Sequence, residues 1–165
     1  MSLDFDSARL PNSFLKPEHH EWRAQLRRFF DREVIPYAAQ WDEDGRIPDE
    51  LWPKSAAVGI LGLGYPEEFG GVTEGIDIWY SIILNEEMAR IAVGGVSATL
   101  LVHGIALPPV INFGSEAIKQ MVAPPVLAGT KRISLGITEP GAGSDVAHLT
   151  TTARLDGDHY VVNGS

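Results

Sequence analysis

KRISLGITEPGAGSD, residues 131–145, is the stretch in which the pattern of the sequence changes. Upstream of it, apolar residues recur at steps of three and four, as they do in helices. Within it, the short apolar run from Arg132 to Thr138 is typical of a strand. Glu139–Asp145, which contains proline and two glycines, is typical of a loop. We therefore expect a helical region to end near residue 131 and a β-region to begin there.

Five segments before residue 131 have the pattern of helices. In the first, Trp22, Leu26 and Phe30 fall on one face. Pro108 and Pro109 are expected to kink or end the fourth, because proline lacks an amide N–H. The expected helices are Pro17–Gln40, a second from Pro48 to Val58, Ile76–Ala92, Gly95 to about Ile111, and a short one that Ser115 caps and that ends at Pro124–Pro125.

Two alternating segments follow the glycine loop. The side-chain types alternate, as they do in strands, over Thr150–Leu155 and over His159–Val162. Asp156-Gly157-Asp158 between them suits a hairpin turn. Asn163-Gly164 is a second hairpin signal with no strand after it, so we expect the chain to be cut inside a β-domain. The predicted fold class is α+β, with an all-α helical domain at 1–130 and the first strands of an antiparallel β-domain at 131–165.

Composition limits the classes of partner. The chain has 165 residues, 44% of them hydrophobic, which is enough for one domain with a core or for one domain and part of another. Lys and Arg number 13 against 22 Asp and Glu, a net charge of −9, so we expect no nucleic acid or anionic membrane partner. The absence of cysteine excludes disulfides, and we expect a cytoplasmic location. The apolar runs Ile76–Leu84 and Val96–Val102 are shorter than the ~18 residues typical of a membrane span, so none is expected.

Leu135–Ser144 joins a strand end to a glycine loop, whose backbone N–H groups can approach phosphate or flavin oxygens without obstruction by side chains. It is not a dinucleotide-binding fingerprint, because Val146 stands where the third glycine would be and no helix pattern follows. Nor is it a P-loop, which requires Gly-Lys-Ser or Gly-Lys-Thr. Taken alone, Gly141–Ser144 also fits an ordinary turn.

The longer string around this loop carries a family resemblance. ITEPGAGSD at 137–145 and YVVNGS at 160–165 resemble the signature of the acyl-CoA dehydrogenase family, and the resemblance extends upstream through 65–71, 86–90 and 113–115. It implies an amino-terminal α-domain and the start of a central β-domain, which the family continues into a carboxy-terminal four-helix bundle absent here. It also implies FAD between the β-domain and the bundle, and α,β-desaturation of an acyl-CoA thioester.

The same resemblance implies roles for single residues. In the family a glutamate takes the α-proton while the β-hydride passes to the flavin. This base is expected beyond Ser165, so no catalytic residue is expected in this chain. No metal ligand is expected either. Thr138 would offer a hydrogen-bond donor that stabilises the negative charge which the flavin gains during hydride transfer. Electron-transferring flavoprotein as acceptor and a homotetramer are implied as well. The residues implied at FAD are Leu135, Gly136, Ile137, Thr138, Gly143 and Ser144; those implied at the substrate are Ser144, which would meet its pantetheine arm, and Ser97, Ala98 and Leu101.

Other polar residues have structural explanations. Asp145 suits a turn or a cap better than a catalytic base. His103 is expected to be a core histidine on an apolar helix, and His19 a solvated residue of a first helical turn. Glu86 and Arg90 have the spacing of an i,i+4 ion pair.

Alternatives to a dehydrogenase stay open. One alternative is a related flavoenzyme on the same scaffold, such as an acyl-CoA oxidase, a nitroalkane oxidase or a flavin monooxygenase, although the intact string TEPGAGSD at 138–145 favours the dehydrogenases. A non-catalytic helical interaction domain is the alternative from another class. Flavin absorbance of the purified protein distinguishes the interaction domain from the enzymes, and anaerobic reduction by acyl-CoA distinguishes the enzymes from one another.

Overall fold

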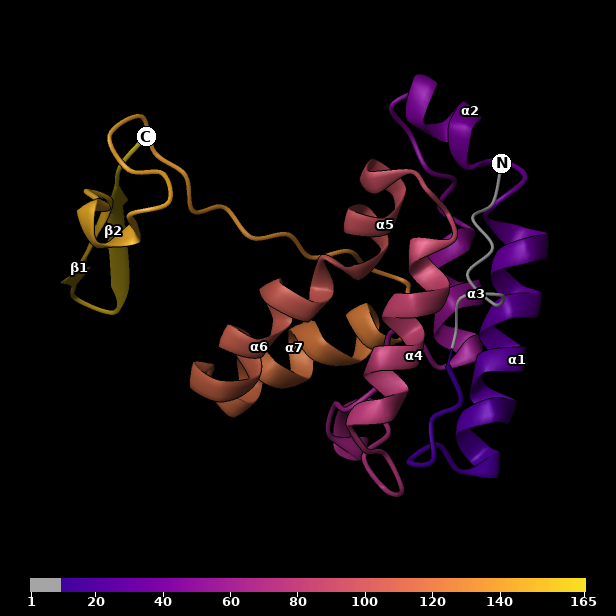
Figure 1. Cartoon of the computed structure of the whole chain (residues 1–165). Coiled ribbons are helices and arrows are strands. Elements are labelled where there is room, and N and C mark those ends of the chain that lie inside the picture. The colour runs from indigo at the N-terminus through magenta and orange to yellow at the C-terminus, as the bar shows by residue number, and fades with distance from the viewer. Residues whose placement is uncertain (1–9) are drawn as a thin grey trace. The chain divides into compact units, whose positions relative to one another are not determined.

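The computed structural model of the protein describes residues 10–165, which belong to two compact units, one up to Ser134 and one from Leu135 to Ser165 (Figure 1). The first unit is helical. Its elements are α1 (Pro17–Glu33), α2 (Ala38–Glu43), α3 (Leu51–Val58), the short 3-10 helix η2 (Glu67–Phe69), α4 (Ile78–Ala89), α5 (Gly94–Leu101), α6 (His103–Phe113) and α7 (Glu116–Leu127). The second unit contains the 3-10 turn η3 (Val146–His148) and the strands β1 (Thr152–Asp156) and β2 (His159–Asn163).

Helices α1 and α4 lie side by side and contribute much of the main core (Figure 1). The apolar face of α1 buries Leu26 and Phe30 completely. The Trp22 indole N–H donates to the Tyr80 backbone carbonyl at 3.1 Å, so its one polar group is satisfied. A second, smaller core joins α6 and α7 to η2 and contains Phe69, Leu107, Ala123, Val126 and Leu127.

The expectation of one helix from Pro17 to Gln40 is wrong in its second half. Helix α1 ends at Glu33, and the Val34 N–H makes the last helical bond, to the Phe30 carbonyl at 3.1 Å. Pro36 accounts for the break, because a proline disfavours helical backbone at the residue before it and has no N–H to donate. The chain turns and begins again as α2.

The fourth expected helix is two helices, α5 and α6, which meet at Val102. Pro108 and Pro109 lie inside α6, which continues past them to Phe113. Gly94–Phe113 spans 20 residues and contains an 18-residue window with a mean hydropathy of 1.5, so by length and composition alone it is apolar enough to cross a bilayer. One such segment is a weak indication, since the core helix of a soluble protein passes the same test; 28% of this window is buried in the protein. The absence of a membrane span stays a prediction.

Side-chain caps set the starts of two other helices. The Asp77 carboxylate accepts the Trp79 N–H at 3.0 Å before α4. The Ser115 hydroxyl accepts the Ile118 N–H at 3.3 Å before α7, as the sequence predicts. Helix α3 ends at Val58, and its C-cap Gly59 has a φ of +97°, in the left-handed region that favours glycine.

The second unit confirms the predicted hairpin. Strands β1 and β2 pair in antiparallel register with Leu155 opposite Tyr160, and Gly157 in the turn has a φ of +64°. The expectation of a strand from Arg132 to Thr138 is wrong. A strand requires a partner to pair with, and no other segment of residues 10–165 pairs with this one. The predicted class, helices followed by an antiparallel sheet, is confirmed.

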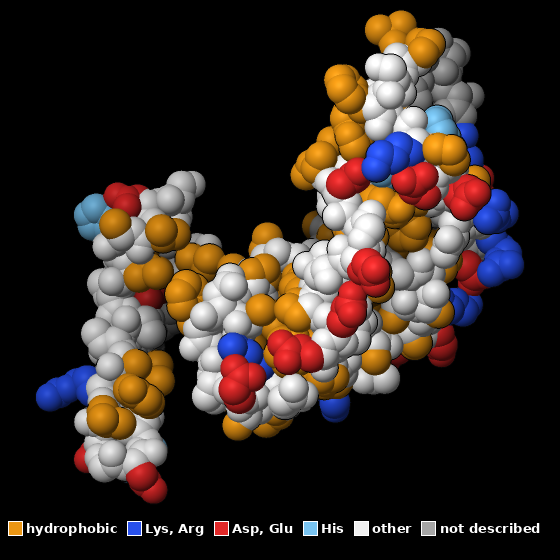
Figure 2. All heavy atoms as spheres, turned by 90° about the horizontal axis from the view of Figure 1, so that it is seen from below, with side chains coloured by type: hydrophobic (Ala, Val, Ile, Leu, Met, Phe, Trp, Pro, Cys, Tyr) orange, Lys and Arg blue, Asp and Glu red, His pale blue; other side chains and the backbone are white. Residues whose placement is uncertain are grey.

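The surface of the helical unit carries charges of both signs. Figure 2 shows acidic and basic side chains lying next to one another on the face in view. Lys54 and Arg32, for example, both lie 2.6 Å from oxygens of Glu33. Exposed pairs of this kind contribute about 0–1 kcal/mol each, so the helical cores rather than the surface charges stabilise this unit.

Candidate functional site

The glycine loop of the second unit is closed by its own backbone. The Glu139 N–H donates to the Ala142 carbonyl at 2.9 Å, and the Ala142 N–H donates back to the Glu139 carbonyl at 3.1 Å. Pro140 and Gly141 form the turn between them. Both residue types favour turns, because proline fixes the backbone angle φ and glycine leaves the backbone free. The loop is thus a defined structure before any ligand is considered.

The Glu139 side chain joins this loop to the segment before β1. Its carboxylate accepts the Thr150 N–H and hydroxyl, each at 2.7 Å, and the Thr151 N–H at 2.9 Å, and the residue is only 7% exposed. Hydrogen bonds from Thr151 and Thr150 lower the pKa of Glu139 from 4.5 to about 2, because they favour the charged form. Glu139 is therefore an ionised anchor and not a proton acceptor. No local pattern in the sequence indicates this role, since the hydrogen-bond partners of Glu139 are eleven and twelve residues away.

The residues expected at a flavin lie on and beside this loop. Leu135 is 42% exposed and Ile137 39% exposed. Within residues 10–165, the backbone N–H and C=O groups of residues 133–138 make no hydrogen bond. A Cβ added at Gly136 or Gly143 would meet no atom within 4 Å. The structure thus brings Leu135, Gly136, Ile137, Thr138, Gly143 and Ser144 to exposed positions within one unit, with polar backbone groups that a ligand can use.

Asp145 has the capping role that the sequence predicts. Its carboxylate accepts the Ala147 N–H at 3.2 Å at the start of η3, and its other oxygen lies 2.7 Å from the His148 ring nitrogen Nδ1. These contacts hold the chain immediately after Ser144.

The residues expected at the acyl chain lie on α5. Leu101 lines a cavity of about 770 Å³ in the helical unit, together with residues of α4, α6 and the loop before η2. Its wall is largely apolar, with Leu84 and Ile105 among the lining side chains. Ser97 is half-buried and Ala98 is exposed, and neither lines this cavity. The structure therefore places Leu101, but not Ser97 and Ala98, at a concave apolar surface.

The expectation that His19 is solvated is wrong, because the side chain is 1% exposed. Its Nδ1 accepts the Lys16 N–H at 3.0 Å, so the proton is on Nε2, which donates to the Asp77 carboxylate at 3.0 Å. Asp77 also caps α4, so the imidazole ties the start of α1 to the start of α4.

A buried carboxylate also connects these two helices. Glu87 is fully buried and accepts hydrogen bonds from Arg23 at 3.1 Å, Arg27 at 2.9 Å and Arg90 at 3.2 Å. Burial acts to raise the pKa of Glu87, but the hydrogen bonds from Arg27 and Arg23 outweigh it, so the pKa is lowered. Arg90 thus pairs with Glu87, whereas Glu86, its expected partner, pairs with Arg23 at 2.6 Å. In residues 10–165 no three His, Asp or Glu side chains are grouped as metal ligands.

Known proteins resemble the chain over nearly all of its length. Residues 16–130 match the sequence profile of the family described as acyl-CoA dehydrogenase, N-terminal domain. The mitochondrial long-chain specific acyl-CoA dehydrogenase of Sus scrofa is 38% identical over 149 residues, which cover 90% of this chain and 34% of that protein. The chain thus spans about a third of the length of this curated relative.

Two solved structures extend the likeness from sequence to fold. A probable acyl-CoA dehydrogenase from Mycobacterium abscessus has a TM-score of 0.83 at 44% identity, covering 92% of this chain and 40% of the other. An acyl-CoA dehydrogenase from Bacillus anthracis, complexed with FAD, has a TM-score of 0.77 at 31% identity, covering 94% of this chain and 27% of the other. Since the family profile covers most of the sequence and these structures share its fold, the chain belongs to the acyl-CoA dehydrogenase family.

Proposed function

We propose that this chain supplies the helical domain and one wall of the flavin site of an FAD-dependent acyl-CoA dehydrogenase. The observation that carries the proposal is the segment 133–138, whose backbone groups make no hydrogen bond within the described chain and which precedes a loop anchored by Glu139. Such groups need a polar partner when they are covered. The polar edge of a flavin ring and a pyrophosphate are partners of this kind, and the related Bacillus anthracis enzyme binds FAD.

The residues present fit that cofactor. The open space at Gly136 and Gly143 lets a ligand approach the backbone closely. FAD, when bound, supplies the acceptor for the hydride that leaves the β-carbon. Thr138 would donate through its backbone N–H and its hydroxyl, and so stabilise negative charge at the ring edge. In the proposed arrangement the ring is held by Leu135, Gly136, Ile137 and Thr138, and the pyrophosphate by Gly143 and Ser144.

An acyl-CoA thioester is the proposed substrate. Ser144 would meet its pantetheine arm, and Ser97, Ala98 and Leu101 of α5 would border the acyl chain. The apolar cavity that Leu101 lines supports the assignment of Leu101, since ligand sites for alkyl chains are concave and mostly apolar. The base that removes the α-proton is proposed to be a glutamate outside residues 1–165. Electron-transferring flavoprotein as acceptor, a homotetramer and a cytoplasmic location complete the proposal.

Gly143→Val tests the flavin site, in an enzyme that carries this chain together with the rest of the family's length. The structure has room for a side chain at Gly143, so the variant is expected to fold. The β-branched side chain would occupy the space beside the pyrophosphate, and the purified protein should contain no FAD. Ala153→Val, an exposed substitution on β1, is the matched control and should retain flavin. Normal FAD content in a folded Gly143→Val protein contradicts the assignment.

A further inference from the structure

Tyr65 forms part of the wall of the cavity that Leu101 lines. It lies in the loop between α3 and α4, whose two arms are joined by a hydrogen bond from the Gly64 N–H to the Val72 carbonyl at 2.9 Å. A Cβ at Gly71 would collide with the Tyr65 backbone, so only glycine lets the arms come this close. The loop therefore fixes the Tyr65 backbone independently of any ligand.

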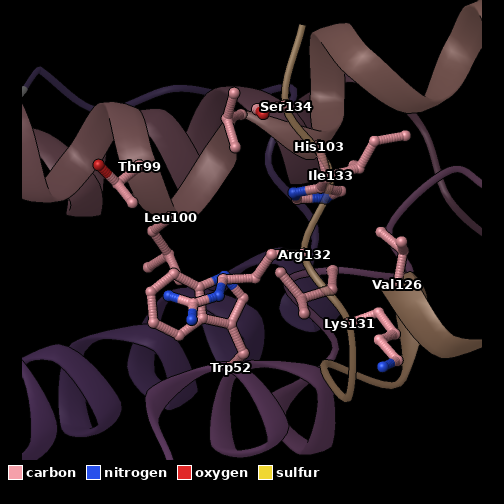
Figure 3. Close-up of a pocket in the computed structure, with 11 residues that line it drawn as sticks. Trp52, Thr99, Leu100, His103, Val126, Lys131, Arg132, Ile133 and Ser134 are labelled. Carbon is pink, nitrogen blue, oxygen red and sulfur yellow. The ribbon is translucent and has the colours of Figure 1, made fainter. Parts of the chain in front are cut away.

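The Tyr65 side chain is bonded to the point where α5 gives way to α6. Its hydroxyl donates to the His103 backbone carbonyl at 3.2 Å, and the two rings lie 6.0 Å apart, centroid to centroid. His103 is 8% exposed, and its side chain also lines a separate cavity of about 240 Å³, in which Figure 3 shows it among the lining residues. Because His103 is buried and begins α6, its carbonyl has a fixed position, and the bond holds the phenol ring in one place.

The residues on either side of this junction line the same cavity as Tyr65. They are Leu101 of α5 and Gly104 and Ile105 of α6. The bond from Tyr65 to His103 thus links the loop wall of the cavity to its helical wall. An acyl chain that outgrows the cavity must displace a residue of the wall, and this bond opposes the displacement of Tyr65.

We propose that Tyr65 is a specificity-determining residue, which limits the length of the acyl chain that the cavity accepts. The inference rests on the proposed function, because it requires the cavity that Leu101 lines to be the acyl site. The phenol ring takes up room at the wall, and a chain longer than the limit must push it aside and break the bond to His103. One neutral hydrogen bond corresponds to about fivefold in affinity, so the bond alone disfavours such chains by about that factor.

Profiles of kcat/KM against chain length test the inference, in an enzyme that carries this chain together with the rest of the family's length. The substrates are saturated acyl-CoAs of even chain length, from butyryl-CoA to eicosanoyl-CoA. Tyr65→Leu removes the ring, so the optimum should move to longer substrates, with a gain of about fourfold for each methylene newly buried. Tyr65→Phe keeps the ring and removes the bond, so the optimum should stay while discrimination against the next longer substrate falls about fivefold. Tyr37→Leu, at an exposed tyrosine of the same unit outside the cavity, is the matched control and should keep the parent's profile.

The outcomes separate this inference from the proposed function. A merely structural role for Tyr65 would lower kcat/KM equally at all chain lengths, and that result in folded Tyr65→Leu overturns the inference, as does a parent enzyme without a length optimum. In both cases the parent still desaturates acyl-CoA, so the proposed function stands. A parent that desaturates no acyl-CoA of the series overturns the proposed function and this inference with it. If thermal melting shows that Tyr65→Leu does not fold, Tyr65→Phe decides, because it keeps the packing of the ring, and unchanged discrimination in that variant overturns the inference.

Discussion

Glu87→Gln should destabilise the helical unit strongly. The substitution keeps the size of the side chain and removes a buried negative charge that Arg23, Arg27 and Arg90 all contact. Removing one partner of a buried ion pair costs about 3–5 kcal/mol, because the remaining charges lose their compensation. The arginine side chains here are 12%, 30% and 11% exposed, so water recovers part of the loss and about 3 kcal/mol is expected.

That loss is large against the ~5–15 kcal/mol by which a domain is stable. At roughly 3 °C per kcal/mol for a chain of this size, it lowers the melting temperature by about 9 °C. Thermal unfolding followed by circular dichroism measures the shift, and urea unfolding with an unchanged slope shows that both proteins unfold from the same compact state.

Glu116→Gln is the matched control for Glu87→Gln. Glu116 is also a helical glutamate in an ion pair, with Lys119 at 2.7 Å, but its side chain is 75% exposed. An exposed pair contributes about 0–1 kcal/mol, so this variant should melt within about 3 °C of the parent. Equal melting temperatures for the two variants would refute the reasoning, since they would show that burial does not make the Glu87 contacts stabilising.

Three further outcomes are expected. Leu101→Phe, in an enzyme with the rest of the family's length, should lower kcat/KM most for the longest acyl-CoA, because Leu101 lines the apolar cavity and a larger side chain shortens it; equal losses at all chain lengths contradict this. The pKa of Glu139 is lowered to about 2, so its contribution to loop stability is complete above pH 4.5 and is lost as the pH falls from 4.5 toward 2. Amide exchange at Thr150 and Thr151 should show this loss, and Glu139→Gln should remove the pH dependence. The 165-residue chain alone should neither retain FAD nor desaturate an acyl-CoA, since a positioned base contributes ~10²–10⁴-fold in rate; flavin-dependent dye reduction by it would show that the base lies within residues 1–165.

The order of elements could be predicted from local sequence. Helical periodicity depends on neighbours three and four residues apart, and a hairpin turn such as the one at Gly157 depends on adjacent residues. The caps at Ser115 and Asp145 were predictable for the same reason, since each bonds to an N–H two or three residues away. The break after α1 could also have been predicted from the sequence, because Pro36 is a local signal that ends a helix.

Contacts between distant residues decided the rest. Glu87 meets Arg23 across 64 positions and His19 meets Asp77 across 58, so spacing along one helix could not show which polar side chains are buried. The residues of Arg132–Thr138 have the pattern of a strand, but a strand forms only where another segment pairs with it. The family string was present in the sequence itself, whereas the anchoring of Glu139 and the burial of Glu87 exist only in the folded chain, because burial and hydrogen bonding are properties of packing.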